Sequence, residues 1–257
     1  MNYSLESMYS LGGTVSIVTG GAGGLGFETA AALGALGSTV VLADLDESRL
    51  DAAVSKLAAQ GVESSGCVCN ITKKADAGRC IEDAAARFGR VDNLINCAGV
   101  SHLEPAEYFS EEKWDFVMSV NLKGTFLMCQ QAGRVMLEQG GGRIVNFSSV
   151  RGLQGRAGDM AYSPSKGAVN MLTKSLAIEW AGRNISVNAV APTFAATAIN
   201  EGILADDKQR EWVLGRIPKG RLADLSDIAS AAAYLCSPCS SFITGQVLYV
   251  DGGWTAA

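Results

Sequence analysis

A tyrosine and a lysine stand four residues apart in the segment Tyr162-Ser163-Pro164-Ser165-Lys166. On a helix this spacing puts the phenol and the ammonium group on one face, one turn apart. A nearby positive charge lowers the pKa of tyrosine toward neutrality, so Tyr162 could take a proton from an alcohol or give one to a carbonyl. Ser149 ends an apolar run upstream and could hydrogen-bond the reacting oxygen. The same spacing also occurs in ordinary surface pairs, so other segments must support this interpretation.

A glycine-rich turn near the start of the chain follows a short apolar run. Residues 14–19 lead into Gly20-Gly21-Ala22-Gly23-Gly24-Leu25-Gly26, and a helical pattern follows. Glycines permit a tight turn, and backbone N–H groups at the helix start can bind a pyrophosphate. A generic turn would look similar in isolation, but dinucleotide sites use this strand–turn–helix context. We expect Gly20, Gly24, Leu25 and Gly26 to bind a dinucleotide cofactor.

An acidic residue ends the second apolar run, Val40-Val41-Leu42-Ala43-Asp44. A carboxylate there can accept hydrogen bonds from both adenosine ribose hydroxyls, whereas a 2′-phosphate would meet like charge. Asp46 could compete for this role, but Asp44 directly follows the strand. Because the glycine turn contains no Lys or Arg, the sequence predicts NAD rather than NADP.

Short apolar runs alternate with longer Ala-rich amphipathic segments along the whole chain. Strands are predicted at 14–19, 39–43, 64–69, 93–97, 143–147, 185–191 and 246–250, and helices at 24–36, 47–60, 73–88, 111–139, 161–181 and 224–236. Near-continuous apolar strands separated by helices predict an α/β, Rossmann-like, doubly wound parallel sheet of seven strands. We expect one domain over residues 1–257, with a substrate lid around 193–220, where the alternation of strands and helices is interrupted.

Composition excludes several other classes of function. The 26 acidic residues exceed the 21 basic ones, so no basic field exists for nucleic acid or an anionic membrane. His102 is the single histidine and no G-x-S-x-G motif occurs, which excludes a His-rich metal site and argues against a Ser-His-Asp hydrolase. No Lys or Arg precedes Arg49 and the seven cysteines are scattered, so we expect reduced thiols and a cytoplasmic location.

Together these segments resemble the short-chain dehydrogenase/reductase family over nearly the whole chain. The glycine turn looks like its T-G-x-x-x-G-x-G, and Asn96-Cys97-Ala98-Gly99 resembles its N-N-A-G. Asn121, Ser149, Tyr162 and Lys166 match its catalytic tetrad in type and order, and Pro192, Ala195 and Thr197 fall in a stretch like its P-G-x-x-x-T. The resemblance implies that Lys166 holds the ribose, that Asn121 positions a water in a proton relay, and that Asn96, Ala98, Gly99, Pro192, Ala195 and Thr197 contact the cofactor. It also implies a homotetramer built through helices 111–139 and 161–181.

Three positions depart from the family pattern. Asn70-Ile71 stands where the family has Asp-Val near adenine, and the Asn70 side chain still offers a carbonyl acceptor. Cys97 replaces the second Asn of N-N-A-G, which puts a structural hydrogen bond in doubt. Thr193 replaces the Gly after Pro192 and adds a side chain where the predicted lid begins.

The predicted reaction is NAD-dependent interconversion of a secondary alcohol and a ketone. We expect a small polyol, sugar or sugar acid as substrate, because the segments near the pocket carry several polar side chains: Ser101, His102, Arg151, Gln154 and Arg156. Either arginine could pair with a substrate carboxylate or remain a solvated surface residue. Leu153, Phe194, Ile199 and Leu204 could instead form a wall for a hydrophobic or cyclic alcohol.

Two further alternatives stay open at the level of sequence. One is a 3-oxoacyl-carrier-protein reductase-like enzyme, and the other is a protein that binds NAD without turnover. The remaining aromatic residues of the long helices, Trp114, Phe116, Phe126 and Trp180, have the spacing of core residues and are interpreted as packing.

Overall fold

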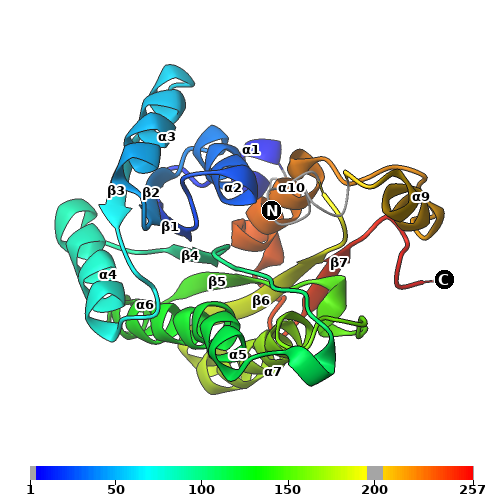
Figure 1. Cartoon of the computed structure of the whole chain (residues 1–257). Helices are drawn as coiled ribbons and strands as arrows, with labels where there is room; N and C mark the ends of the chain where they lie inside the picture. The colour runs from blue at the N-terminus through cyan, green and yellow to red at the C-terminus, as the bar shows by residue number, and fades with distance from the viewer. Residues whose placement is uncertain (1–3, 196–204, 257) are drawn as a thin grey trace.

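One sheet of seven parallel strands runs through the middle of the molecule in a computed structural model, which describes residues 4–195 and 205–256 (Figure 1). Its order is β3-β2-β1-β4-β5-β6-β7, and every neighbouring pair is parallel. The strands are β1 (Val15–Thr19), β2 (Thr39–Asp44), β3 (Ser64–Val68), β4 (Asn93–Asn96), β5 (Gly142–Phe147), β6 (Ile185–Pro192) and β7 (Val247–Val250). The predicted doubly wound α/β fold is therefore confirmed.

Helices cover both faces of the sheet, as Figure 1 shows. The helices on one face are α2 (Gly24–Ala35), α3 (Glu47–Ala59) and α10 (Leu225–Cys236), and those on the other are α4 (Lys74–Phe88), α5 (Glu111–Met118), α6 (Thr125–Gln139) and α7 (Tyr162–Trp180). Two further helices lie outside these two groups: α1 (Leu5–Tyr9), which the sequence pattern did not predict, and α9 (Asp207–Gly215). Turns of 3₁₀ helix occur at η1 (Ala106–Tyr108), η3 (Val150–Gly152), η4 (Ala181–Arg183) and η6 (Pro238–Ser240).

The strands in the middle of the sheet are buried along most of their length because helices cover both faces there, whereas β3 and β7 are partly exposed. Successive side chains of a strand point to opposite faces. In β1, Ile17 belongs to the core under α4, α6 and α7, while Val18 belongs to the core under α2, α3 and α10. This burial holds all seven carboxyl ends at one edge, where ligands of such folds bind.

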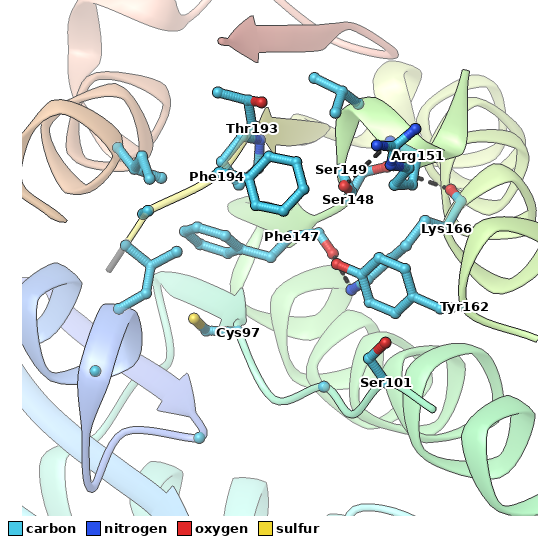
Figure 2. Close-up of a pocket in the computed structure, with 18 of the residues that line it drawn as sticks. Cys97, Ser101, Phe147, Ser148, Ser149, Arg151, Tyr162, Lys166, Thr193 and Phe194 are labelled. Carbon is cyan, nitrogen blue, oxygen red and sulfur yellow. Dashed lines mark hydrogen bonds between the residues drawn. The ribbon is translucent and has the colours of Figure 1, made fainter. Parts of the chain in front are cut away.

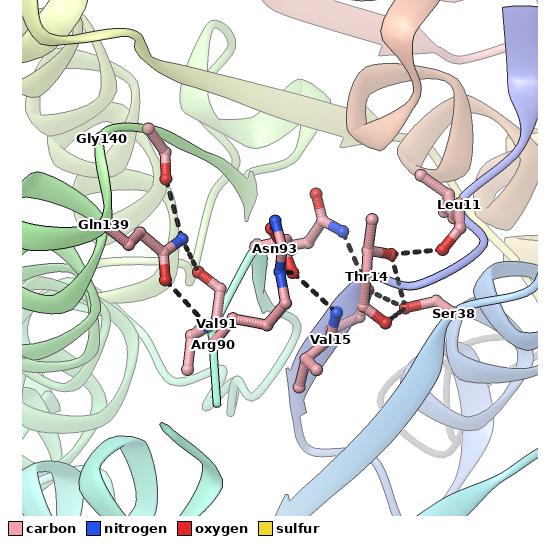
Figure 3. Close-up of polar contacts among 12 residues, drawn as sticks. Leu11, Thr14, Val15, Ser38, Arg90, Val91, Asn93, Gln139 and Gly140 are labelled. Atoms are coloured by element: carbon pink, nitrogen blue, oxygen red, sulfur yellow. Dashed lines mark hydrogen bonds and ion pairs between the residues drawn. The ribbon is translucent and has the colours of Figure 1, made fainter. Parts of the chain in front are cut away.

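A polar network fixes the opposite edge, at the amino ends of the central strands (Figure 3). The Val15 N–H donates to Asp92 Oδ2 at 2.9 Å, and Arg90 holds the same carboxylate at 2.6 Å. Asn93 Nδ2 donates to Ser16 Oγ at 3.0 Å, and Ser16 bonds Ser38 at 2.7 Å. Buried polar groups stabilise a fold only when they find such partners, and here they tie β1 to β4 and to the start of β2.

The long helix predicted at 111–139 is interrupted. Between α5 and α6 the chain forms a π-helical turn, η2 (Ser119–Gly124), which contains the predicted catalytic Asn121. A Cβ at Gly124 would lie 2.7 Å from Ile71 Cδ1, so glycine permits the close approach of this turn to the segment after β3. A single π turn is a short local insertion within a helical segment, so the apolar periodicity on either side does not reveal it.

The interpretation of the helical aromatic residues as core is wrong for three of the four. Trp114, Phe116 and Phe126 are 38%, 57% and 39% exposed in the single chain. Trp180 does pack inside, against Gly133 of α6. Periodicity shows that a helix has an apolar face, but it does not show whether the chain's own sheet covers that face.

The segment predicted as a lid is described only in part. Thr197, Ile199 and Leu204 lie outside the described residues. Around them, Phe194 before the gap and Val213 and Ile217 after it form a small core with Val150 and Trp254. This cluster joins the ends of β6 and β7 to α9, next to the carboxyl edge of the sheet.

Candidate active site

A cavity of about 670 Å³ opens at the carboxyl ends of β1, β4, β5 and β6. Of the predicted site residues, those that line it are Gly20, Gly24, Leu25, Gly26, Ala98, Gly99, Ser149, Tyr162, Lys166, Pro192 and Ala195. Figure 2 shows Ser149, Tyr162 and Lys166 gathered on one side of it, with Cys97 and Phe194 on other walls. The parallel sheet thus brings together side chains that are far apart in the sequence.

The glycine turn has the backbone geometry that a phosphate site requires. Gly20 adopts φ +67°, and a Cβ there would lie 2.9 Å from the Ala98 Cα. A Cβ at Gly26 would overlap the carbonyl of Gly20, so helix α2 can pack this closely on the turn only with glycine. No side chain caps the start of α2 at Gly23, which leaves backbone N–H groups facing the cavity edge. These residues fit the pyrophosphate of a dinucleotide.

One acidic and one basic side chain lie beside this turn. Asp44 accepts hydrogen bonds from the backbone N–H groups of Ala22, at 3.1 Å, and Leu45, at 2.8 Å. Arg49 lines the cavity, and its guanidinium occupies the space that a Cβ on Gly23 would need. The glycine turn itself contains no Lys or Arg, as the sequence shows, but the fold brings Arg49 to it from α3. Arg49 was missed because it comes from the first turns of α3 rather than from the turn itself.

The serine, tyrosine and lysine lie where β5 ends and α7 begins. Ser149 caps the short η3 turn, and its Oγ accepts the Arg151 N–H at 3.1 Å. Tyr162 opens α7, and Lys166 follows one turn later with 5% of its surface exposed. Lys166 Nζ donates to the Phe147 carbonyl at 2.7 Å and lies 5.6 Å from the Tyr162 ring centroid (Figure 2). The predicted juxtaposition of these three side chains is present in the fold.

The proton affinities differ from the sequence expectation. Burial raises the pKa of Tyr162 to about 12, and its hydrogen bond with Ser149 opposes that rise. Burial also lowers the pKa of Lys166 to about 8, against a small opposing effect of the Cys97 thiol. The protein's own groups therefore keep Tyr162 protonated at neutral pH. The expected lowering of its pKa does not follow from Lys166, because the low-polarity surroundings disfavour the charged form of both groups.

Asn121 is fully buried, and its side chain is hydrogen-bonded within the protein. The Val100 N–H donates to Asn121 Oδ1 at 2.8 Å, and Asn121 Nδ2 donates to the Val100 carbonyl at 2.9 Å and to Ser165 Oγ at 3.0 Å. These bonds join the π turn to the loop after β4 and to α7. Asn121 thus fixes the segment carrying Ala98 and Gly99 relative to the helix carrying Tyr162 and Lys166.

Four described residues predicted to contact the cofactor do not line the cavity: Asp44, which is held beside the glycine turn, and Asn70, Ile71 and Asn96. Asn70 Oδ1 already accepts the Thr72 N–H at 3.1 Å and the Thr72 hydroxyl at 2.7 Å, so the acceptor expected for adenine is used locally. Asn96 is buried in the sheet and bonds Asn146 Oδ1 at 2.9 Å. Ile71 is buried against Gly124. Sequence position alone could not show that these polar groups had nearer partners.

The two other departures from the family pattern lie in the cavity wall. Burial raises the pKa of the Cys97 thiol to about 12, so it is neutral at physiological pH and acts as a small apolar group. Thr193 lines the cavity, and its Oγ1 is buried without a hydrogen-bond partner among the described residues. Neither side chain is placed to replace Tyr162 in proton transfer.

The predicted substrate-side residues separate into two groups. Ser101, His102, Arg151, Arg156 and Phe194 line the cavity, and His102 lies 3.3 Å from Glu104. Gln154 does not line it, because its Oε1 accepts the Trp254 indole N–H at 2.8 Å, and Leu153 is 62% exposed outside it. Asp159 and Gln209, which no motif marked, also line the cavity.

A family model described as enoyl-(acyl carrier protein) reductase matches residues 20–255. The chain belongs to the short-chain dehydrogenase/reductase family, whose members use a nicotinamide cofactor and act on CH–OH groups. It is 38% identical over 257 residues to gluconate 5-dehydrogenase of Gluconobacter oxydans, a match that covers 99% of both chains. It is 39% identical to D-threitol dehydrogenase of Mycolicibacterium smegmatis over 98% of this chain and 96% of that one.

Among solved structures, the fold matches a gluconate 5-dehydrogenase from Burkholderia cenocepacia in complex with NADP and tartrate. The TM-score is 0.96 at 32% identity, and the match covers 99% of this chain and 100% of that one. In the part of the chain that the structure describes, no helix is both long and apolar enough to cross a membrane. Nor do the described residues include three or more His, Cys, Asp or Glu side chains grouped as a metal site.

Proposed function

We propose that the protein is an NAD-dependent dehydrogenase that interconverts a secondary alcohol and a ketone on a small, hydroxyl-rich substrate. The observation that carries this proposal is the cavity itself: Ser149, Tyr162 and Lys166 share it with the glycine turn. A cofactor bound at the turn and a substrate held at Ser149 would therefore occupy one continuous space. The nicotinamide, when bound, supplies the acceptor or donor of the hydride.

In this proposal each residue has one task. Ser149 Oγ donates a hydrogen bond to the substrate oxygen, and Tyr162 Oη moves the proton between that oxygen and the protein. Lys166, protonated below a pKa of about 8, holds the ribose. Because the protein's own groups raise the pKa of Tyr162 to about 12, oxidation also needs the positive charge that an oxidised nicotinamide carries. Asn121 would contribute to a water-mediated proton relay through its backbone carbonyl, because its side chain is bonded to Val100 and Ser165.

The preference for NAD over NADP rests on Asp44. Its carboxylate is held at the end of β2 by two backbone N–H groups, so it cannot easily turn away from a 2′-phosphate. Arg49 argues in the opposite direction, since a guanidinium at the glycine turn can bind a phosphate, and the Burkholderia relative was solved with NADP. We favour NAD because Asp44 belongs to the strand and Arg49 to an exposed helix face.

The substrate class is supported by the relatives and by the polar wall of the cavity. Relatives named for gluconate and D-threitol match over nearly the whole chain. Ser101, His102 and Arg156 offer hydrogen-bonding groups, which suits a polyol, sugar or sugar acid better than a long acyl chain. An acyl-carrier-protein reductase is the alternative that the family-model description favours.

The assembly and location are also proposals. Exposed apolar side chains lie on the helices that the family resemblance assigns to a tetramer, among them Phe116, Met171 and Ile178. Such a patch favours burial against another copy of the chain. All seven cysteines are free thiols, as expected for a protein that works in the cytoplasm. Residues 1–257 would form one catalytic domain, with the described parts of the predicted lid, residues 193–195 and 205–220, beside the substrate.

The proposal is tested by NAD⁺ reduction across matched panels of polyols, sugar acids and hydrophobic secondary alcohols, with Tyr162→Phe as the control variant. The substitution removes the transferable proton and keeps the ring, so turnover should fall at least about 100-fold while NADH binding stays nearly intact. Turnover of only hydrophobic alcohols would exclude the substrate class. If Tyr162→Phe kept more than about a tenth of the activity, the role of the phenol would be wrong.

A further inference from the structure

The substrate end of the cavity is positively charged, although the whole chain carries a net charge of −5. Among the described residues, the charged side chains that line the cavity are Arg49, Arg151, Arg156, Lys166 and Asp159. Arg49 stands at the glycine turn and Lys166 beside Tyr162. Arg151 and Arg156 are therefore the positive charges that neither the cofactor site nor the catalytic group uses.

Arg151 is held in place by aromatic rings rather than by a carboxylate. Its guanidinium carbon lies 5.5 Å from the Trp254 ring centroid and 6.0 Å from that of Phe194. Nη1 donates to the Gly155 carbonyl at 3.3 Å, but Nη2 is buried and has no hydrogen-bond partner in the described part of the chain. A buried guanidinium donor without an acceptor is unfavourable, so a partner from outside the chain would be bound favourably there.

The one carboxylate in the cavity wall is not available to Arg151. Asp159 accepts the Ser163 N–H at 3.2 Å and the Ser163 hydroxyl at 2.8 Å, and it is 3% exposed. Burial, followed by the charge of Arg156, lowers the pKa of Arg151, and the charge of Asp159 opposes this without forming an ion pair. A bound anion would give the buried guanidinium a partner and would offset the positive charge of Arg156.

The position of Arg151 along the chain fixes where such an anion would lie. Its backbone N–H donates to Ser149 Oγ at 3.1 Å, within the same short η3 turn. The serine hydroxyl and the base of the Arg151 side chain are thus close together, and the Trp254 and Phe194 rings position the guanidinium (Figure 2). A ligand could place a charged end on the arginine and a hydroxyl or keto carbon at Ser149 only if it were short.

We propose that Arg151 determines substrate specificity by binding a carboxylate, with Nη2 as the donor and Arg156 adding positive charge. This inference rests on the proposed function and narrows its substrate class to short hydroxycarboxylic acids. Neutral polyols would lack the group that satisfies the guanidinium, so they would be the poorer substrates.

The test compares acids with the alditols of the same carbon skeleton: D-gluconate with D-glucitol, and D-threonate with D-threitol. The ratio of kcat/KM for acid over alditol is measured with both NAD⁺ and NADP⁺. It should fall about tenfold or more in Arg151→Gln, mainly through KM, and by less in Arg151→Lys, which keeps the charge but not the guanidinium fork. Arg183→Gln is the matched control, because exposed Arg183 lies before β6, at the opposite edge of the sheet.

A binding measurement separates this proposal from the proposed function. Calorimetric titration of each acid and alditol into NADH-saturated Tyr162→Phe protein, with and without Arg151→Gln, needs no turnover. Acids should bind more tightly than alditols, and Arg151→Gln should remove that difference. Equal ratios in Arg151→Gln and the unmodified protein, or no acid binding more tightly than its alditol, would overturn the role of Arg151. Absence of turnover with every alcohol would instead overturn the proposed function, and the titration would still decide on Arg151.

Discussion

The choice between NAD and NADP is the property for which the structure places an acidic and a basic residue, Asp44 and Arg49, at the same glycine turn. Asp44→Asn removes the negative charge at the end of β2 and keeps one oxygen to accept the Ala22 or Leu45 N–H, which Asp44→Ala would leave unpaired. The unmodified protein should prefer NAD by at least about tenfold in kcat/KM, and Asp44→Asn should reduce that preference by increasing the use of NADP.

The size of the effect follows from the distance between the Asp44 carboxylate and a 2′-phosphate on the adenosine ribose. Two unit charges about 5 Å apart repel by about 3 kcal/mol at an effective dielectric constant near 20. Asp44 is only partly buried, so solvent and salt screen this repulsion. A remaining difference of about 1.4 to 2.8 kcal/mol corresponds to a tenfold to hundredfold change in the cofactor ratio.

Arg49 provides the second half of the experiment. In the Asp44→Asn protein, Arg49→Gln should remove most of the gained activity with NADP, because no carboxylate then offsets the guanidinium at the glycine turn. Lys56→Gln, on the exposed face of the same helix, is the control for charge alone. Steady-state rates with both cofactors, measured for the unmodified protein, both single variants and the double variant, complete this double-mutant cycle. The reasoning would be refuted if the unmodified protein used both equally, or if Asp44→Asn changed the ratio less than about threefold.

Three further predictions concern the lysine, the turn and the assembly. Burial lowers the pKa of Lys166 to about 8 from its usual 10.5, so the unfolded chain binds more protons between these pH values and stability should rise with pH across that window. Denaturation at pH 7 and pH 10 should show the unmodified protein gaining up to about 3 kcal/mol relative to Lys166→Met, and no difference in pH dependence would contradict the effect of burial. Gly26→Ala should weaken NAD binding at least about tenfold in calorimetry, because its Cβ overlaps the Gly20 carbonyl, whereas Gly182→Ala has open space and should bind normally. Ile178→Asp should dissociate the assembly in light scattering, since Ile178 is 85% exposed in the single chain, and an unchanged mass would exclude this face as the interface.

The order of elements and the pairing of Tyr162 with Lys166 could be read from the sequence because they depend on local periodicity. Apolar strands alternate with amphipathic helices, which determines a parallel sheet with helices on both faces. The four-residue spacing of Tyr162 and Lys166 places both side chains on one face of any helix that contains them. Gly20 is required by a positive φ, which is a property of the local backbone.

The contacts of individual side chains were decided only by the tertiary structure. Asn70 and Asn96 were assigned to the cofactor by position, yet hydrogen bonds to Thr72 and Asn146 occupy them. The π turn around Asn121 left no trace in the apolar pattern, because it is a short local insertion between two helical segments.

For the charged residues of the cavity too, the sequence shows which residues are present and the tertiary structure decides what they contact. Arg49 was visible in the sequence, but its approach to Gly23 depends on how α3 packs beside the glycine turn. The stacking of Arg151 on Trp254 joins residues that are about a hundred positions apart and meet only because the end of β7 passes the η3 turn. Backbone periodicity is a short-range property that sequence records directly. Which distant side chains meet, and which donors remain unpaired, depends on packing that the whole chain determines together.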